Sequence, residues 1–182
     1  MDDIVKAALK KWPHVPACYG WLALDARGDW YMRDERTQAA GPFPQLKGSK
    51  ITHEKLLGFI HRNYLCDARG AWFFQNGPQR VFVQLEAAPH IWRLQAQGDG
   101  PVEVHSHTGE PVQSVQQAWL DEHQRLFLSA QLPGLDQPTL GLVHSMDMLL
   151  AAQALEQAQW PLQERSHAEL LAQFGVLCVP CP

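Results

Sequence analysis

The sequence lacks the features that mark several large classes of protein. Its apolar runs fall far short of the roughly 20 residues that a membrane-spanning helix needs, so we expect no membrane partner. The net charge is -4 and no stretch concentrates lysine and arginine, which argues against a nucleic-acid partner. The chain opens on Met1, Asp2 and Asp3 without an apolar signal-peptide region, so the expected location is the cytoplasm.

Signatures of catalysis and cofactor binding are also missing. The sequence contains no Walker loop, no G-x-G-x-x-G fingerprint and no G-x-S-x-G elbow. Four cysteines in 182 residues do not make a disulfide scaffold. We therefore expect no cofactor and assign no catalytic residue, which favours a module that binds its ligand over one that converts it.

What the chain has is an ordinary globular composition and a repeated turn. Hydrophobic residues make up 46% and charged residues 19%, which is typical of a folded domain. The segment DARGDW at residues 25–30 returns as DARGAW at residues 67–72. A degenerate third copy begins at Asp121 and leads into the apolar run at residues 126–128, with Gln124 in place of glycine. A repeat of this kind indicates an architecture of similar hairpin units.

The repeated residues suit a hairpin turn. The aspartate can accept hydrogen bonds from backbone N–H groups just ahead of it. The glycine supplies the positive φ that a three-residue bulged hairpin loop requires. Because Gln124 replaces this glycine, we expect the third turn to depart from that geometry. We interpret the repeat as a folding device and not as a functional signature.

Local patterns predict the remaining elements. An N-terminal helix is followed by the first hairpin, a loop over residues 37–50, and a second helix whose N-cap is Thr52. Ser145 is the predicted N-cap of a third helix, and Ser166 opens a fourth with a capping box. The predicted helices span 2–11, 52–64, 145–159 and 166–175, the predicted strands 19–24, 29–33, 71–76, 81–85, 90–97, 102–106 and 139–144, and a turn covers 98–101.

These elements predict an α+β fold. Repeated β-hairpin units would form one or two small antiparallel sheets packed against three or four helices. The length favours a single compact domain over residues 1–182. Two lobes, 1–97 and 98–182, are the alternative division.

The densest polar cluster beside aromatic residues predicts a ligand site at Gln75, Asn76, Gln79 and Arg80. Amides and an arginine on a loop between rigid strands can bind a carboxylate, a phosphate or a peptide backbone. The competing interpretation is that residues 76–78 form a turn and that Arg80 pairs with a carboxylate. A ligand site would require Asn76 and Arg80 to lie side by side in a concave pocket.

Two alternatives involve chemistry. A metal site could be built from His105 and His107 together with Cys178 and Cys181, although the favoured interpretation is a polar strand face and no metal. A hydrolase could use His144, with Ser145 and Asp147 close by in sequence. Members of a catalytic triad meet in space and seldom along the chain, so Ser145 is better explained as an N-cap.

Several segments resemble known families. Residues 19–22, 51–53, 59–64, 72–81, 85–89 and 141–144 resemble an uncharacterised proteobacterial family of unknown function, most specifically in WFFQNGPQRV at 72–81. Residues 81–89 are distantly similar to the V-x-V-E-D-A-P strand of another unknown-function family with repeated D-G-x-W hairpins, with Ala87 in place of its aspartate. That second resemblance implies repeated small β motifs and a regulatory or signalling role.

The sequence thus leads to three hypotheses. The first is a cytoplasmic module without catalysis that binds a small molecule or a peptide, with a regulatory or signalling role. The second is a hydrolase or metal-assisted enzyme that uses His144 or the His105/His107 pair. The third is a structural or assembly protein. The sequence leaves the oligomeric state open.

Overall fold

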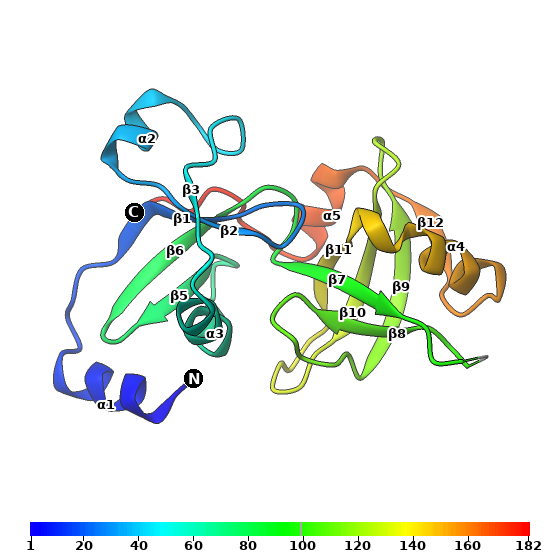
Figure 1. The fold of residues 1–182 in the computed structure, drawn as a ribbon, viewed down its shortest axis with the longest axis horizontal. Coiled ribbons are helices and arrows are strands. Elements are labelled where there is room, and N and C mark those ends of the chain that lie inside the picture. The colour runs from blue at the N-terminus through cyan, green and yellow to red at the C-terminus, as the bar shows by residue number, and fades with distance from the viewer. Residues whose placement is uncertain (99) are drawn as a thin grey trace. The chain divides into compact units, whose positions relative to one another are not determined.

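Two mixed six-stranded sheets organise the chain in the computed structural model, which describes residues 1–98 and 100–182 (Figure 1). Each sheet belongs to one of two compact units. The first unit comprises Met1–Asp25, Asp29–Glu86 and Val176–Pro182, and the second comprises Ala26–Gly28 and Ala87–Gly175. The predicted turn over 98–101 includes Asp99, which lies outside the described residues.

The sheet of the first unit has the strand order β3-β2-β1-β6-β5-β4. Neighbouring strands are antiparallel except β1 and β6, which run parallel. The α3 helix packs on one face, where the Phe59 and Phe74 rings meet edge-on at 5.3 Å. The strands are β1 Cys18–Leu24, β2 Trp30–Met32, β3 Ser49–Lys50, β4 Tyr64–Cys66, β5 Trp72–Asn76 and β6 Gln79–Leu85, and the helices are α1 Asp3–Lys11, α2 Glu35–Ala40 and α3 Glu54–Arg62.

The sheet of the second unit has the order β12-β9-β10-β11-β7-β8. Its parallel pairs are β11 with β7 and β12 with β9. The strands are β7 His90–Gln95, β8 Glu103–Ser106, β9 Ser114–Leu120, β10 Leu126–Gln131, β11 Thr139–Val143 and β12 Leu162–Glu164, and the helical segments are η1 Ser145–Asp147, α4 Met148–Glu156 and α5 His167–Gln173. Among the described residues, no helix is both long and apolar enough to cross a bilayer.

The α+β class is confirmed, with two differences in detail. First, three strand pairings are parallel, and each joins strands that are far apart in the chain. Second, the predicted loop over 37–50 begins inside α2, whose N-cap Asp34 accepts hydrogen bonds from the Thr37 backbone and hydroxyl at 2.8 and 2.7 Å. This helix has no buried residue and therefore no apolar stripe to reveal it in the sequence.

Two predicted N-caps are also displaced by one residue. His53, not Thr52, accepts the Leu56 N–H at the start of α3. His144, not Ser145, accepts the Met146 N–H at the start of η1. In both cases the ring nitrogen Nδ1 takes the place of the expected hydroxyl oxygen, because an unprotonated imidazole nitrogen is also an acceptor. The capping box of α5, formed by Ser166 and Glu169, is present as predicted.

All three aspartate-initiated turns share one hydrogen bond. In each, the aspartate carboxylate accepts the N–H of the residue four positions later, at 3.0 Å for Asp25, 2.9 Å for Asp67 and 2.8 Å for Asp121. Gln124 adopts a φ of +57°, so it keeps the left-handed conformation that Gly28 and Gly70 adopt. The expectation that the third turn departs from this geometry is therefore wrong, because the network around Asp121 holds a non-glycine residue in the strained region.

Replacing Gln124 by glycine should therefore stabilise the protein. Gln124→Gly relieves the steric cost of a side chain at positive φ, which is about 1 kcal/mol. Chemical denaturation should show a higher midpoint with an unchanged slope. Gln124→Ala keeps the strained φ and serves as the control, which should show no such gain. A glycine variant no more stable than the alanine variant would contradict this reading of the turn.

The second unit has two apolar layers, one on each face of its sheet. Val112 donates its backbone N–H to Val104 of β8, while the Gln113 N–H bonds to Gln131 of β10, so the sheet closes on itself. Its interior is filled by a cluster of buried side chains around Trp92 and Leu128. The outer face carries a second cluster, in which α5 covers Trp119, Phe127 and Leu142.

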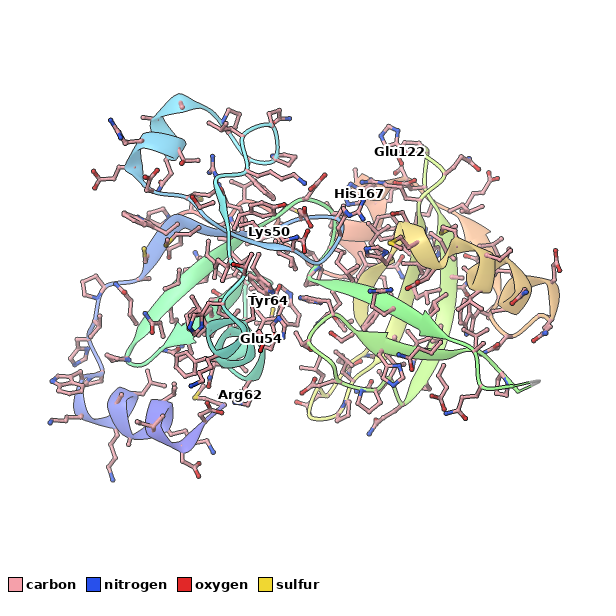
Figure 2. All side chains as sticks on the ribbon, viewed as in Figure 1. Lys50, Glu54, Arg62, Tyr64, Glu122 and His167 are labelled. Carbon is pink, nitrogen blue, oxygen red and sulfur yellow. The ribbon has the colours of Figure 1, made fainter. Side chains whose placement is uncertain are left out.

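The position of α5 is fixed by contacts at its first turn. The His167 backbone N–H donates to the Glu122 carboxylate at 2.8 Å, and these two residues lie near each other in Figure 2. The His167 ring nitrogen Nε2 lies 2.7 Å from the Ala87 carbonyl oxygen. Leu170 is fully buried beneath the helix. At the other end of α5, the Phe174 ring contacts Trp119 of β9.

Candidate functional site

A hollow of about 660 Å³ lies on the outer face of the second unit's sheet, at the C-terminal end of α5. We call it the glutamine pocket, because amide side chains from several elements line it. Strand β9 contributes Gln116, Gln117 and Trp119, β10 contributes Ser129, the following loop Gln137 and Pro138, β12 and its continuation Gln163 and Arg165, and the end of α5 Gln173 and Phe174. Its volume falls within the range of pockets that hold small molecules.

Strand register brings these residues to one face of the sheet. Trp119 of β9 is paired with Gln163 of β12 and with Phe127 of β10, and Gln117 is paired with Ser129. Residues two apart on a strand share a face, so the polar pair Gln117 and Ser129 continues the apolar surface that α5 covers. The pocket therefore begins where the helix ends.

Trp119 carries the most informative feature of the pocket. The residue is 4% exposed, and its ring meets the Phe174 ring edge-on at 5.7 Å. Its indole N–H is buried, and no acceptor in the described part of the chain hydrogen-bonds to it. A buried donor without a partner costs about 1–3 kcal/mol, and such groups in native structures call for an explanation.

The other polar groups of the pocket are partly engaged. Gln117 donates to the Pro161 carbonyl at 2.6 Å, which fixes the segment entering β12. Arg165 donates to the Gln173 side-chain oxygen, which joins the β12 continuation to α5. Gln137 and Gln163 are solvent-exposed. Each glutamine amide offers both a hydrogen-bond donor and an acceptor, and amides do not titrate near neutral pH. The pocket can therefore hydrogen-bond a polar molecule without strong selection for its charge.

The predicted ligand residues Gln75, Asn76, Gln79 and Arg80 belong to the first unit and do not line this pocket. Gln75 is 1% exposed and donates to the Gly77 carbonyl at 2.9 Å, so it stabilises the turn. Gln79 donates to the Pro16 carbonyl at 3.1 Å. Arg80 is exposed, and its guanidinium lies 4.8 Å from the centre of the Phe73 ring. The competing interpretation required an ion pair between Arg80 and a carboxylate, and none of the ion pairs described involves Arg80.

The register of this hairpin separates the two residues expected to act together. Asn76 is paired with Gln79, and Gln75 with Arg80. Because successive strand residues point to opposite faces, Asn76 and Arg80 lie on different faces of the sheet. Ligand binding by this loop stays a prediction, and its four side chains do not converge on one point.

The four residues of the metal alternative are divided between the two units. His105 lies on β8, whereas His107 follows the strand and its Nδ1 accepts the Ile91 N–H at 3.2 Å. Cys178 and Cys181 belong to the first unit. Within the described ranges, no group of three or more histidine, cysteine or acidic residues could hold a metal ion.

The residues of the hydrolase alternative have structural contacts. His144 is buried and caps η1 through its Nδ1. Asp147 accepts hydrogen bonds from the Arg93 side chain at 2.7 Å and from the Leu94 N–H at 3.0 Å. Burial opposes ionisation of Asp147, but these bonds outweigh it and lower its pKa. Ser145 is exposed at the start of η1, and structural contacts account for His144 and Asp147.

The comparisons with known proteins are sparse. No curated protein matches the sequence. A crystal structure of a DUF1285 family protein from Shewanella baltica OS155 is similar, with 17% sequence identity and a TM-score of 0.48 over 74% of this chain and 91% of that one. The expected membership of an uncharacterised family is confirmed: the DUF2944 family model, described as "Protein of unknown function (DUF2946)", matches residues 1–181, and the chain belongs to that family.

Proposed function

We propose that the protein is a cytoplasmic binding module without catalysis, and that its glutamine pocket holds a small polar molecule. The observation that carries the proposal is a hollow of about 660 Å³ lined in part by Trp119, whose buried indole N–H has no acceptor among the described residues. A ligand that shifts the side chains over this N–H and places an oxygen or nitrogen against it would supply the missing acceptor and recover the cost of the unpaired donor.

The chemistry of the lining defines the ligand class. Glutamine amides bind hydroxyl, carbonyl and amide groups, and they are neither nucleophiles nor general bases. Trp119 and Phe174 provide an apolar surface for a ring or a short carbon chain. Arg165 is the one formal charge among the described lining residues. The pocket therefore suits a neutral or singly anionic molecule rich in hydrogen-bonding groups, such as a sugar, a sugar acid, a nucleoside or an amino acid.

A thermal-shift screen with these four compound classes at millimolar concentration tests the proposal. At least one class should raise the melting temperature of the wild-type protein, because a ligand at 100 times its dissociation constant stabilises the native state by about 2.7 kcal/mol. Gln163→Ala and Gln173→Ala should each weaken binding by about two- to tenfold, the worth of one hydrogen bond.

Both glutamines are exposed, so their loss should leave the unliganded protein folded. Gln153→Ala on α4 is the matched control, because Gln153 is exposed and is not one of the residues that line the pocket; this variant should bind like wild type. The proposal fails if no compound in the panel shifts the melting temperature. It also fails if the two pocket variants respond to the ligand as strongly as Gln153→Ala does.

A further inference from the structure

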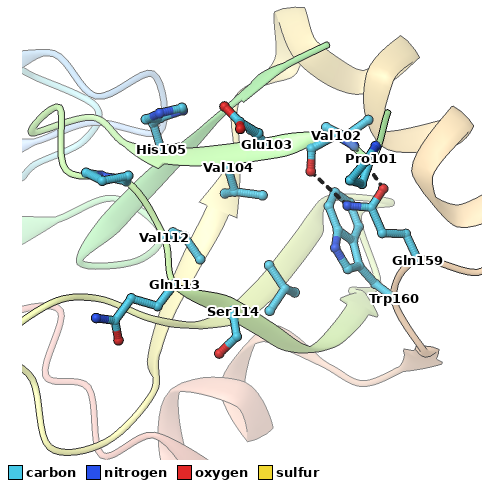
Figure 3. A pocket seen from close by; sticks show the side chains of 12 residues that line it. Pro101, Val102, Glu103, Val104, His105, Val112, Gln113, Ser114, Gln159 and Trp160 are labelled. Carbon is cyan, nitrogen blue, oxygen red and sulfur yellow. Dashed lines mark hydrogen bonds between the residues drawn. The ribbon is translucent and has the colours of Figure 1, made fainter. Parts of the chain in front are cut away.

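A second hollow opens in the closed sheet of the second unit, between β8 and the start of β9 (Figure 3). We call it the strand slot. It has a volume of about 350 Å³ and is lined by residues 101–105, 111–115 and 159–160. The two strand segments are joined at one end, where Val112 donates to the Val104 carbonyl at 2.9 Å. From there they diverge, and the slot fills the space between them.

The side chain of Gln159 occupies one position of a missing strand. Its oxygen accepts the Val102 N–H at 3.0 Å, and its nitrogen donates to the Val102 carbonyl at 2.7 Å (Figure 3). This exchange of two hydrogen bonds with one residue is the pattern that an opposing residue makes in an antiparallel ladder. A carboxamide has the same donor and acceptor as a peptide group, so Gln159 stands in for a backbone.

The slot also has a free strand edge, on β9, and an apolar floor. The ladder between β9 and β12 covers Ala118–Leu120, which leaves residues 114–117 of β9 with β10 as the one strand partner described. Val104 and Val112 project into the space between the two segments (Figure 3). Val115 and Trp160 complete the apolar lining. Such a floor suits one side chain of an extended chain, because alternate side chains of a strand point the same way.

We propose that the strand slot binds an extended peptide segment of a partner protein, whose backbone replaces the Gln159 amide at Val102. An apolar peptide side chain rests on Val104 and Val112. Glu103 is the one carboxylate among the described lining residues, and no lysine or arginine accompanies it, so a basic residue next to the apolar one is favoured. This is strand addition at an exposed sheet edge, in which backbone bonds give affinity and the pocket gives specificity.

The exchange is nearly balanced in hydrogen bonds. Val102 loses two bonds to Gln159 and regains two from the peptide, while the half-buried Gln159 amide moves into water. The burial of the apolar side chain then supplies the net driving force. In the unbound protein Gln159 protects an edge that would otherwise pair indiscriminately. The inference uses residues other than those of the glutamine pocket and does not depend on it.

Selection from a displayed library of random peptides of about six residues, the usual strand length, tests the inference. Enriched peptides should carry an apolar residue next to a basic one. Gln159→Ala should bind a selected peptide about three- to tenfold more tightly, because its competitor for Val102 is removed. Gln153→Ala should bind like wild type. Methylation of one backbone nitrogen of the peptide should weaken binding about tenfold, since it removes a ladder donor.

The peptide variant keeps the test independent of protein folding, because N-methylation leaves the protein unchanged. The peptide should also shift the NMR resonance of the Val102 amide and that of the Gln159 side-chain amide. The inference is overturned if no peptide is enriched, if Gln159→Ala binds no more tightly than wild type, or if every N-methylated peptide binds as well as its parent.

Discussion

Gly141→Ala should destabilise the protein by about 3 kcal/mol or more, at the upper end of what overpacking a core costs. A Cβ at Gly141 would lie 2.3 Å from the Trp92 ring nitrogen and 2.9 Å from the His90 carbonyl oxygen. Trp92 has no exposed surface, and its Nε1 donates to the Leu128 carbonyl at 3.1 Å. Neither the ring nor the backbone can move away without breaking the interior of the closed sheet.

Urea denaturation of Gly141→Ala and Gly58→Ala gives the comparison. A Cβ at Gly58 in α3 would meet the end of the flexible Arg62 side chain at 3.3 Å, so this variant should gain about 0.5–1 kcal/mol from helix propensity. Both variants replace glycine by alanine, so the difference between their stabilities reports the difference in packing around the two positions. A Gly141→Ala variant that loses less than about 1 kcal/mol would mean that Trp92 does not lie against β11 as described.

The second large effect is a dependence of stability on pH that comes from His90. This residue is 3% exposed, its ring stacks on Trp92 at 5.2 Å, and its Nδ1 lies 3.3 Å from the Ser106 hydroxyl. Burial lowers the pKa of His90 to about 3. The folded protein therefore keeps this ring neutral down to about pH 3, whereas the unfolded chain protonates it near pH 6.5.

Between these two pH values the unfolded state binds one more proton than the folded state, so stability falls as the pH falls. The slope is about 1.4 kcal/mol per pH unit, and the contribution is fully present above about pH 6.5. Between pH 7 and pH 5 His90 alone should remove about 2 kcal/mol from the free energy of unfolding. The buried carboxyls of Asp121 and Asp147, whose pKa values are lowered in the folded protein, add their own loss of stability at lower pH.

Denaturation at several pH values between 5 and 7 measures this slope. His90→Phe keeps a ring on Trp92. It should reduce the slope of the unfolding free energy against pH by the contribution of about one proton. His123→Gln, at a side chain that is 69% exposed, is the matched control for the loss of a histidine. If His90→Phe does not fold, an NMR titration of the wild-type ring provides the answer. A slope unaffected by His90→Phe, or a ring that titrates near pH 6.5, would contradict the burial of His90.

Features with local causes could be predicted from the sequence. The hairpins at Asp25 and Asp67 follow from turn chemistry within five residues, and the capping box at Ser166 follows from a four-residue pattern. Helix α2 could not be predicted, because it is short and lacks an apolar face. The positive φ of Gln124 was also out of reach, because the bonds around Asp121 override its intrinsic preference.

The candidate site depends on contacts that no local pattern encodes. Gln117 is far in sequence from Gln163 and Gln173, and the parallel pairing of β12 with β9 brings Gln163 to the same region of the sheet as Gln117. Trp119 could be predicted as a core residue, but the lack of an acceptor for its N–H emerges only from the packed structure. The concentration of glutamine between residues 113 and 173 is the one sequence signal that could have directed attention to this unit.

An NMR titration of the indole N–H resonances tests the central claim most directly. Any compound that raises the melting temperature in the thermal-shift screen should move the resonance of Trp119 downfield as its N–H gains an acceptor. This resonance is assigned by its absence from Trp119→Phe, and that of Trp92, which already donates to Leu128, should stay in place. A stabilising compound that leaves the Trp119 resonance unmoved would contradict the assignment of the glutamine pocket as the binding site.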